Sequence, residues 1–262
     1  MDRFDLTGRV VLITGGGGGI GRALASAFAS CGADIAVAGR TLSTLEETCA
    51  LVREQGRRAL ALVCDVRELA ACEAAVARTV AELGRLDVLV NNAGANFVAP
   101  AAAISQNGWR AILSTVLDGT FHMSRAAFAA LAESGRGRII SIGATNASGG
   151  SPLMAPSGAG KAGVKSLMES LAVEWAQFGI TANCVSPGPV DTAGANERLW
   201  KDRAAYQRVA ERVPLGRRLA TPADCVGAVL FLASDSASFI TGAEVVIDGG
   251  ERLRQLHGDF TL

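Results

Sequence analysis

A run of glycines near the start of the chain has the composition of a phosphate-binding loop. Residues 14–21 read Thr-Gly-Gly-Gly-Gly-Gly-Ile-Gly and stand between an apolar run at 9–14 and a helical pattern at 20–31. Glycine lets the backbone approach a pyrophosphate closely, and the amino end of a helix attracts its negative charge. A flexible loop would have the same composition, but the position between a buried strand and a helix favours dinucleotide binding.

The elements that would position this loop follow a simple alternation. Near-continuous apolar runs, expected to be strands, occur at 9–14, 34–39, 59–64, 86–91, 138–142, 180–185 and 244–248, with helical patterns between them. Strands that are apolar on both faces and separated by helices indicate a parallel sheet covered on both sides. The sequence therefore predicts an α/β fold, a Rossmann-type doubly wound parallel sheet of about seven strands in a single domain spanning residues 1–262.

The end of the second expected strand bears on the choice of cofactor. An acidic residue there would bind the ribose 2′-hydroxyl of NAD, whereas an arginine accommodates the 2′-phosphate of NADP. The chain has Gly39-Arg40 at this point and no acid. Either Arg40 is a solvated loop residue or it binds the phosphate, and in the second case NADPH is expected over NADH.

Several motifs together resemble the short-chain dehydrogenase/reductase family over essentially the whole chain. They are T-G-x-x-x-G-x-G at 14–21, Cys64-Asp65-Val66, Asn91-Asn92-Ala93-Gly94 and Pro187-Gly188. In that family the Asp65 position contacts adenine, the Asn92 position braces the cofactor loop, and Pro187-Gly188 with Thr192 flanks the nicotinamide. The resemblance implies a cofactor site formed by Gly15, Gly17, Gly18, Gly19, Ile20, Gly21, Arg40, Asp65, Val66, Asn92, Ala93, Gly94, Lys161, Pro187, Gly188, Val190 and Thr192.

The catalytic residues usual in this family are incomplete. Its members reduce carbonyls with a Tyr-x-x-x-Lys pair, helped by a serine and an asparagine. Lys161 is present, but Ser157 stands where the tyrosine should be. The expected serine is Ala144 and the expected asparagine is Val116, while the single tyrosine, Tyr206, lies well downstream.

This pattern of loss is similar to that of the 2,4-dienoyl-CoA reductases. The similar segments are 116–121 (VLDGTF), 156–164 (PSGAGKAGV), 171–175 (LAVEW) and 187–190 (PGPV), with 91–97, 108–109 and 192–200 similar to bacterial relatives. In the mitochondrial-type enzyme the Ser157 and Lys161 positions are functional, and an asparagine occupies the position of Asp118. That enzyme also has a tyrosine at the position of Asn146.

The chemistry of the two reactions bears on the missing tyrosine. Reducing a ketone creates a localised alkoxide, which needs an acid beside it. Hydride addition to an unsaturated thioester creates an enolate or dienolate, whose delocalised charge is held by hydrogen-bond donors. We therefore expect an NADPH-dependent reductase of 2,4-dienoyl-CoA, 2-enoyl-CoA or another acyl thioester. A carbonyl or 3-oxoacyl-thioester reductase using Tyr206, and a dinucleotide-binding module without catalysis, are the alternatives.

Four residues are candidates for the catalytic site. Lys161, expected in the first turn of a helix, either holds the nicotinamide ribose and supplies positive potential or is a surface lysine. Ser157 either caps that helix or holds the thioester oxygen. Asp118 is either structural or orients a proton-delivering water, and burial in an apolar pocket would raise its pKa and let it donate a proton. Asn146 binds the substrate or caps a loop.

The stretch from about residue 187 to 214 is too long and irregular to be an ordinary connection, which predicts a substrate lid at about 188–214. Between residues 193 and 218, seven basic residues stand against three acidic ones, Glu197, Asp202 and Glu211. The basic residues are Arg198, Lys201, Arg203, Arg208, Arg212, Arg217 and Arg218. They form either a solvated helical face or a patch that binds the phosphates of coenzyme A.

Composition restricts the partners and the location. A formal net charge of zero gives no electrostatic case for nucleic acid or an acidic membrane as partner, and no apolar run approaches the roughly 20 residues of a membrane span. Six cysteines lack metal-site spacing, so we expect no metal and buried free thiols in a cytoplasmic protein. The family resemblance implies a homotetramer packed through helices at 104–132 and 161–177.

Overall fold

Seven parallel strands form a single sheet in the computed structural model, which describes residues 4–199 and 202–256. Their order is β3-β2-β1-β4-β5-β6-β7. The strands are β1 (Val10–Thr14), β2 (Asp34–Gly39), β3 (Ala59–Val63), β4 (Val88–Asn91), β5 (Arg138–Ile142), β6 (Thr181–Pro187) and β7 (Glu244–Ile247). The predicted doubly wound α/β fold is confirmed, with strand ends that differ from the expected ones by one or two residues.

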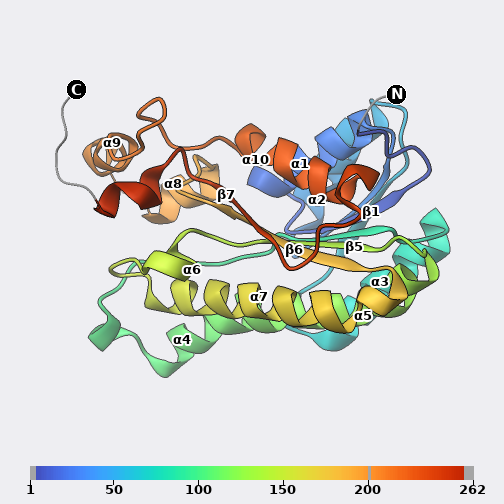
Figure 1. Cartoon of the computed structure of the whole chain (residues 1–262), viewed down its shortest axis with the longest axis horizontal. Helices are drawn as coiled ribbons and strands as arrows, with labels where there is room; N and C mark the ends of the chain where they lie inside the picture. Colours follow the sequence, from blue (N-terminus) through green and yellow to red (C-terminus); the bar gives the residue numbers. More distant parts are fainter. Residues whose placement is uncertain (1–3, 200–201, 257–262) are drawn as a thin grey trace.

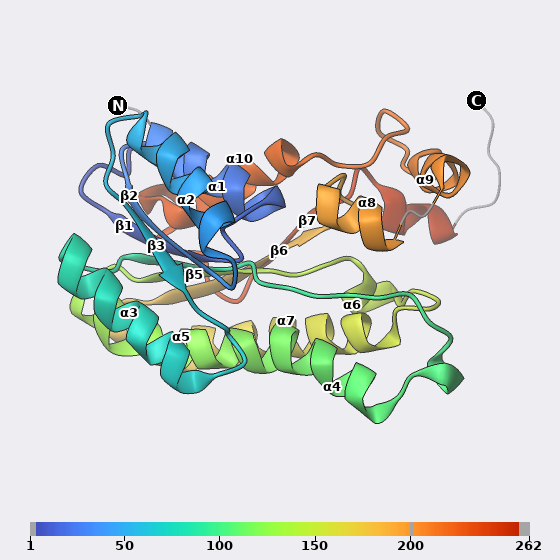
Figure 2. The ribbon, with the colours of Figure 1, turned by 180° about the vertical axis from the view of Figure 1, so that it is seen from behind.

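Helices cover both faces of the sheet (Figures 1 and 2). One face carries α1 (Gly19–Ser30), α2 (Leu42–Arg53) and α10 (Pro222–Ala233). The other carries α3 (Leu69–Leu83), α4 (Gln106–Leu113), α5 (Gly119–Glu133) and α7 (Ala155–Glu174). Each layer packs on its own apolar cluster, and the strand side chains alternate between the two clusters. Because both faces are covered, most strand residues are apolar on both faces, which is the pattern that predicted the strands from the sequence.

Short helices complete the chain. They are α6 (Asn146–Gly149), α8 (Ala193–Leu199) and α9 (Arg203–Ala210), the 3₁₀ turns η1 (Ala101–Ala103), η3 (Ala176–Phe178), η4 (Asp235–Ala237) and η5 (Glu251–Leu256), and the π-helical segment η2 (Ser114–Asp118). The expectation of an irregular stretch at 187–214 is corrected by α8 and α9. Side-chain acceptors at Thr192 and Asp202 receive the backbone N–H groups of Ala195 and Ala205, which explains why these helices begin there.

The strand order reverses between β1 and β4, and all seven strands point in the same direction. In such sheets ligands bind beyond the carboxyl ends of the strands at this reversal. The glycine run follows β1 there, and the segment containing α8 and α9 lies at the same end of the molecule as α6 and the amino end of α7 (Figure 1).

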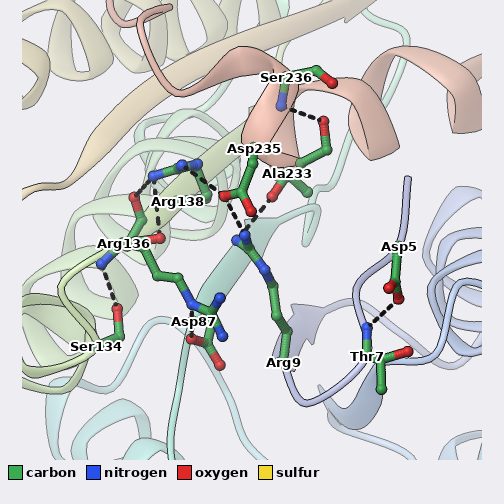
Figure 3. Close-up of polar contacts among 12 residues, drawn as sticks. Asp5, Thr7, Arg9, Asp87, Ser134, Arg136, Arg138, Ala233, Asp235 and Ser236 are labelled. Carbon is green, nitrogen blue, oxygen red and sulfur yellow. Dashed lines mark hydrogen bonds and ion pairs between the residues drawn. The ribbon is translucent and has the colours of Figure 1, made fainter. Parts of the chain in front are cut away.

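A cluster of charged side chains ties the opposite, amino-terminal edge of the sheet together (Figure 3). Arg9 and Arg138 are both buried, and the carboxylate of Asp235 in η4 pairs with both guanidinium groups. Asp87 beside them accepts a bond from the backbone N–H of β1 at 3.0 Å. Because this cluster lies at the other end of the strands from the glycine run, it serves the stability of the sheet.

Two sequence-based expectations concern the general character of the protein. Of the six cysteines, five are buried, as expected, and Cys31 is half-buried. Within residues 4–199 and 202–256, no helix is long and apolar enough to cross a membrane.

Candidate active site

The glycine loop wraps closely around the start of α1. A Cβ atom on Gly21 would collide with the carbonyl oxygen of Gly15, so only glycine fits at that point. Gly19 has a φ of +51°, which L side chains rarely adopt. Open space lies around Gly18, where nothing is within 4 Å of an added Cβ. The loop therefore leaves room in front of the amino end of a 12-residue helix, the arrangement that receives a pyrophosphate.

Side chains from β1 and the turn after β4 hold this loop in place. The Nδ2 group of Asn92 donates to the carbonyl oxygens of Thr14 at 2.9 Å and Gly15 at 3.1 Å. The Thr14 hydroxyl oxygen accepts the N–H groups of Asn92 and Ala93, both at 3.0 Å, and exposed Gly94 follows directly. Asn92 is thus positioned to brace the loop, as the resemblance implied, and Thr14 contributes a contact that sequence reasoning did not assign.

Helices α1 and α2 support the loop from its other side. The Thr48 hydroxyl donates to the carbonyl oxygen of Gly16 at 2.9 Å, and Nη2 of Arg22 donates to that of Gly17 at 2.7 Å. Arg22 is also paired with Glu47 at 2.7 Å. Neither Arg22 nor Thr48 was singled out in the sequence, and only the basic residue after the last glycine could have suggested such a role.

The turns after β2 and β3 form the expected adenosine side of the site. Arg40 is exposed after β2, and its charge helps to lower the pKa of the Asp65 carboxyl after β3. The larger cause of that lowering is the hydrogen bonding from Arg67, whose Nε lies 2.9 and 3.0 Å from the two carboxylate oxygens. The side chain of Val66 is buried against Gly119 of α5. Two arginines thus flank the carboxylate, which gives this side of the site positive charge.

The segment after β6 lies close to the glycine loop. Pro187 ends β6, and the N–H of Gly188 donates to the carbonyl oxygen of Ile247 at 2.9 Å. Val190 pairs with Ala220, and half-buried Thr192 stands with its methyl carbon 3.3 Å from the Cβ position of Gly19. Of the residues expected around the nicotinamide, Thr192 therefore faces the amino end of α1, where half-buried Ile20 also lies.

Lys161 extends from α7 to the end of β5. Its Nζ donates to the carbonyl oxygen of Ile142, the last residue of that strand. The side chain as a whole is half-buried, and burial lowers the pKa of Lys161 to about 8, partly opposed by the nearby thiol of Cys184. Helix α7 begins at Ala155, so Lys161 lies in its second turn, not in the first as expected. The ammonium is held at the carboxyl edge of the sheet without a carboxylate beside it among the described residues, and so remains a source of positive potential.

Asn146 begins α6 and Ser157 lies in the first turn of α7, the helix that carries Lys161. Ser157 is the third residue of α7 and is buried, so it does not cap the helix. The backbone oxygen of Asn146 lies 3.2 Å from the Cβ position of Gly158, which places α6 against the start of α7. The Oδ1 atom of Asn146 is buried without a hydrogen-bond partner among the described residues. Such an orphaned acceptor is a group that a bound molecule can satisfy.

Asp118 does not meet the expectation of an apolar environment. It is exposed at the end of η2, and its neighbours Val116 and Leu117 are the residues that contact α7, at Gly160 and Gly163. The π turn adds a residue to the helical path, so a helix pattern drawn through 109–121 misplaces the faces beyond it. Proton donation by a buried Asp118 is therefore wrong.

The charged side chains in and just after the expected lid are partly exposed and partly paired. Arg203, Arg208, Arg212 and Arg217 are exposed, and Arg218 pairs with Asp224 at 2.7 Å. The hydroxyl of Tyr206, the chain's only tyrosine, donates to Asp191 at 2.9 Å. Lys201 and the end of the similar segment at Trp200 lie outside the described residues. The exposed arginines are accessible from solvent, which is consistent both with a solvated face and with a patch that binds the phosphates of coenzyme A.

These residues fit a nicotinamide dinucleotide. The cradle at Gly15 and Gly21 has room only for glycine, open space lies before the amino end of α1, and a positively charged turn follows β2 and β3. When such a cofactor is bound, the glycine loop would hold its pyrophosphate, Arg40 and Asp65 its adenosine, and Lys161 its nicotinamide ribose. No group of three or more potential metal-ligating side chains occurs within the described part of the chain.

Comparison with known proteins agrees with this arrangement. A family model described as enoyl-(acyl carrier protein) reductase matches residues 15–251. The chain is 39% identical over 247 residues to a probable 2,4-dienoyl-CoA reductase of Bacillus subtilis, covering 94% of this chain and 97% of that protein. It is 35% identical over 246 residues to the peroxisomal 2,4-dienoyl-CoA reductase of Danio rerio, covering 94% and 82%.

A solved structure gives the same fold. A gluconate 5-dehydrogenase from Burkholderia cenocepacia in complex with NADP and tartrate superimposes with a TM-score of 0.90 at 36% identity, covering 95% of this chain and 97% of that one. That relative carries NADP, and its named substrate differs from those of the reductases. The similarity therefore extends to proteins that act on different substrate classes.

Proposed function

Because the chain belongs to the short-chain dehydrogenase/reductase family, whose members are nicotinamide-dependent oxidoreductases, we propose that it reduces a C=C bond of an unsaturated acyl thioester with NADPH. The substrate class is 2,4-dienoyl-CoA or 2-enoyl-CoA. The observation that carries the proposal is the pair Ser157 and Lys161 on α7, where the family's carbonyl reductases have tyrosine and lysine. This pair has hydrogen-bond donors but no phenol to protonate an alkoxide.

NADPH is the cofactor that the chain's residues favour. No acid follows β2, so the ribose 2′-hydroxyl of NADH would lack its usual acceptor there. Arg40 is exposed at this point and is the residue type that accommodates a 2′-phosphate. The NADP carried by the Burkholderia cenocepacia relative supports the same choice.

The site residues are suited to holding the negative charge that forms on a thioester oxygen. NADPH, when bound, supplies the hydride. Ser157 is a buried residue whose hydroxyl makes no hydrogen bond to another side chain within the described residues, so the hydroxyl can donate to the thioester oxygen. The Lys161 ammonium adds positive potential at the same edge of the sheet, where burial strengthens its field. Asn146 orients the substrate or a water through its orphaned Oδ1. The carbon is then protonated by water.

A coenzyme A thioester also suits the segment at 188–214, which we infer to be a lid over the site. Helix α9 and the chain just after it present exposed arginines, a residue type that binds phosphate groups in a bidentate manner. The dienoyl-CoA reductases among the relatives support this substrate class.

We further infer a cytoplasmic homotetramer, for which light scattering of the purified protein should give four times the mass of one chain.

The test of the proposed function follows NADPH absorbance with three substrates: a trans-2,trans-4-dienoyl-CoA, a trans-2-enoyl-CoA and a 3-oxoacyl-CoA. Oxidation with the dienoyl or enoyl substrate is expected. Lys161→Ala should lower that rate by about 100-fold or more, the usual effect of losing one donor to a developing oxyanion. Lys165→Ala, one turn further along α7, is the matched control and should keep the rate. Turnover only with the 3-oxo substrate would support the carbonyl reductase, and NADPH binding without any turnover would support the non-catalytic module.

A further inference from the structure

The turn between β3 and α3 is anchored from beneath by a histidine. The carbonyl oxygen of Val66 lies 3.1 Å from Nδ1 of His122, which comes from α5. The same oxygen receives the thiol of Cys72 at 3.6 Å. A Cβ atom on Gly119 would lie 2.6 Å from the Val66 side chain, so the helix backbone itself presses on this residue. Val66 is therefore fixed at its side chain and at its carbonyl group.

Val66 occupies a particular place in the proposed site. It follows Asp65 in the turn that would receive the adenine ring, and the Asp65 side chain is itself held by Arg67. In this turn the backbone N–H of Val66 stands next to the Asp65 carboxylate, whose oxygens accept bonds from Arg67, and the Val66 carbonyl group belongs to the same residue. A side chain that holds this carbonyl group therefore sets the orientation of the Val66 backbone N–H toward the adenine ring.

We propose that His122 is a positioning residue for the adenine end of the cofactor site, acting through the Val66 carbonyl group. This inference rests on the proposed binding of NADPH with its adenine over the turn at 64–67. The geometry requires a proton on Nδ1, because the carbonyl oxygen can only accept.

Two substitutions separate the hydrogen bond from the space that the ring fills. His122→Leu removes the donor and keeps an apolar side chain, whereas H122N places an amide nitrogen near the position of Nδ1. Thr120→Val is the matched control, because it removes a buried 2.7 Å hydrogen bond in the same helix that does not reach Val66. All variants are first compared by thermal unfolding, and H122N keeps the inference testable if His122→Leu folds poorly.

The experiment measures binding by titration calorimetry and needs no turnover. The probes are NADPH, adenosine 2′,5′-bisphosphate as its adenine half, and reduced nicotinamide mononucleotide as the other half. We expect His122→Leu to weaken NADPH and the bisphosphate by about five- to tenfold, the effect of one lost hydrogen bond. Binding of the mononucleotide should not change. H122N should restore the affinity to within about twofold, and Thr120→Val should leave it unaltered.

Three results would overturn the inference. His122→Leu could bind the bisphosphate as tightly as the unsubstituted protein, or it could weaken both halves equally, which would indicate a general structural role. H122N could also behave like His122→Leu. If the unsubstituted protein binds neither NADPH nor the bisphosphate, the proposed cofactor is wrong and the inference fails with it, whereas intact binding with no effect of His122 refutes the inference alone.

Discussion

Replacing Lys161 by methionine should abolish turnover and at the same time stabilise the protein. The ammonium is placed where burial lowers its pKa to about 8, and its hydrogen-bond acceptor is a neutral carbonyl oxygen. A charged group whose pKa falls on folding makes the folded state less stable while it remains protonated. Methionine has a similar length and no charge, so it removes this cost together with the positive potential that the proposed chemistry needs.

The magnitude follows from the pKa. A fall from the ordinary value of 10.5 to about 8 corresponds to a cost of about 3 kcal/mol. Because the side chain keeps some exposed surface and the bond to Ile142 is lost, we expect a net gain in the free energy of unfolding of about 1 kcal/mol. For a chain of this size that gain raises the Tm by about 2–4 °C.

The dependence on pH identifies the cause. Below about pH 8 the lysine is protonated in both the folded and the unfolded state, so the whole cost is present. Between about 8 and 10.5 the folded state loses its proton first, and the cost disappears as the pH rises. The advantage of the methionine variant should therefore be largest at neutral pH and absent above about pH 10.5.

Thermal and urea unfolding at pH 7 and at higher pH provide the assay. Lys165→Met is the matched control, because Glu244 pairs with Lys165 at 2.9 Å and its hydrogen bond raises the pKa of that lysine. That variant should be equally or less stable than the unsubstituted protein below pH 10. Lower stability of Lys161→Met at pH 7, or an advantage that does not change with pH, would refute the reasoning.

Three further predictions address the cofactor, the alternative donor and the fold. Arg40→Asp should raise the KM for NADPH and lower that for NADH, changing their ratio by about tenfold or more in steady-state kinetics, because the 2′-phosphate loses a charged partner. Tyr206→Phe should keep turnover within about twofold, because the Tyr206 hydroxyl is bound to Asp191; a large loss would revive the carbonyl reductase. Asp235→Asn should lower the free energy of unfolding by about 1–2 kcal/mol in urea without changing KM, because two buried arginines lose their carboxylate. The Asp235 pKa is lowered mainly by its bond from Arg9, so its contribution is present above pH 3.8 and should fade as the pH falls below that value.

The fold and the grouping of the candidate cofactor-site residues at one edge of the sheet were predictable because their signals are local. Each strand is a short apolar run, and the expected site residues follow directly after the ends of those runs. The glycines at 15–21 and Asn92 are examples, since a parallel sheet brings all the carboxyl ends to one edge. A local pattern therefore sufficed to gather residues that are far apart in the sequence, such as Gly15 and Asn92, which are 77 positions apart.

The remaining features depend on contacts that no local pattern carries. His122 meets Val66 across 56 residues, and Arg22 meets Glu47 across 25, and neither pair has a periodic signal. Asp118 was misplaced because a regular helix was assumed where the structure has a π turn. The two helices within 187–214 were missed because they are short and polar outside, although the residues that cap them, Thr192 and Asp202, stand in the sequence.

The central claim is that this site reduces a carbon–carbon double bond without a tyrosine. The most direct measurement supplies NADPH deuterated at the transferable position of the nicotinamide, together with a 2,4-dienoyl-CoA and a 3-oxoacyl-CoA, and locates the deuterium in the product by mass spectrometry and NMR. The account predicts one deuterium on a carbon of the former double-bond system and none transferred to the 3-oxo substrate. Deuterium on the carbinol carbon of a 3-hydroxyacyl product, with the dienoyl substrate untouched, would contradict it.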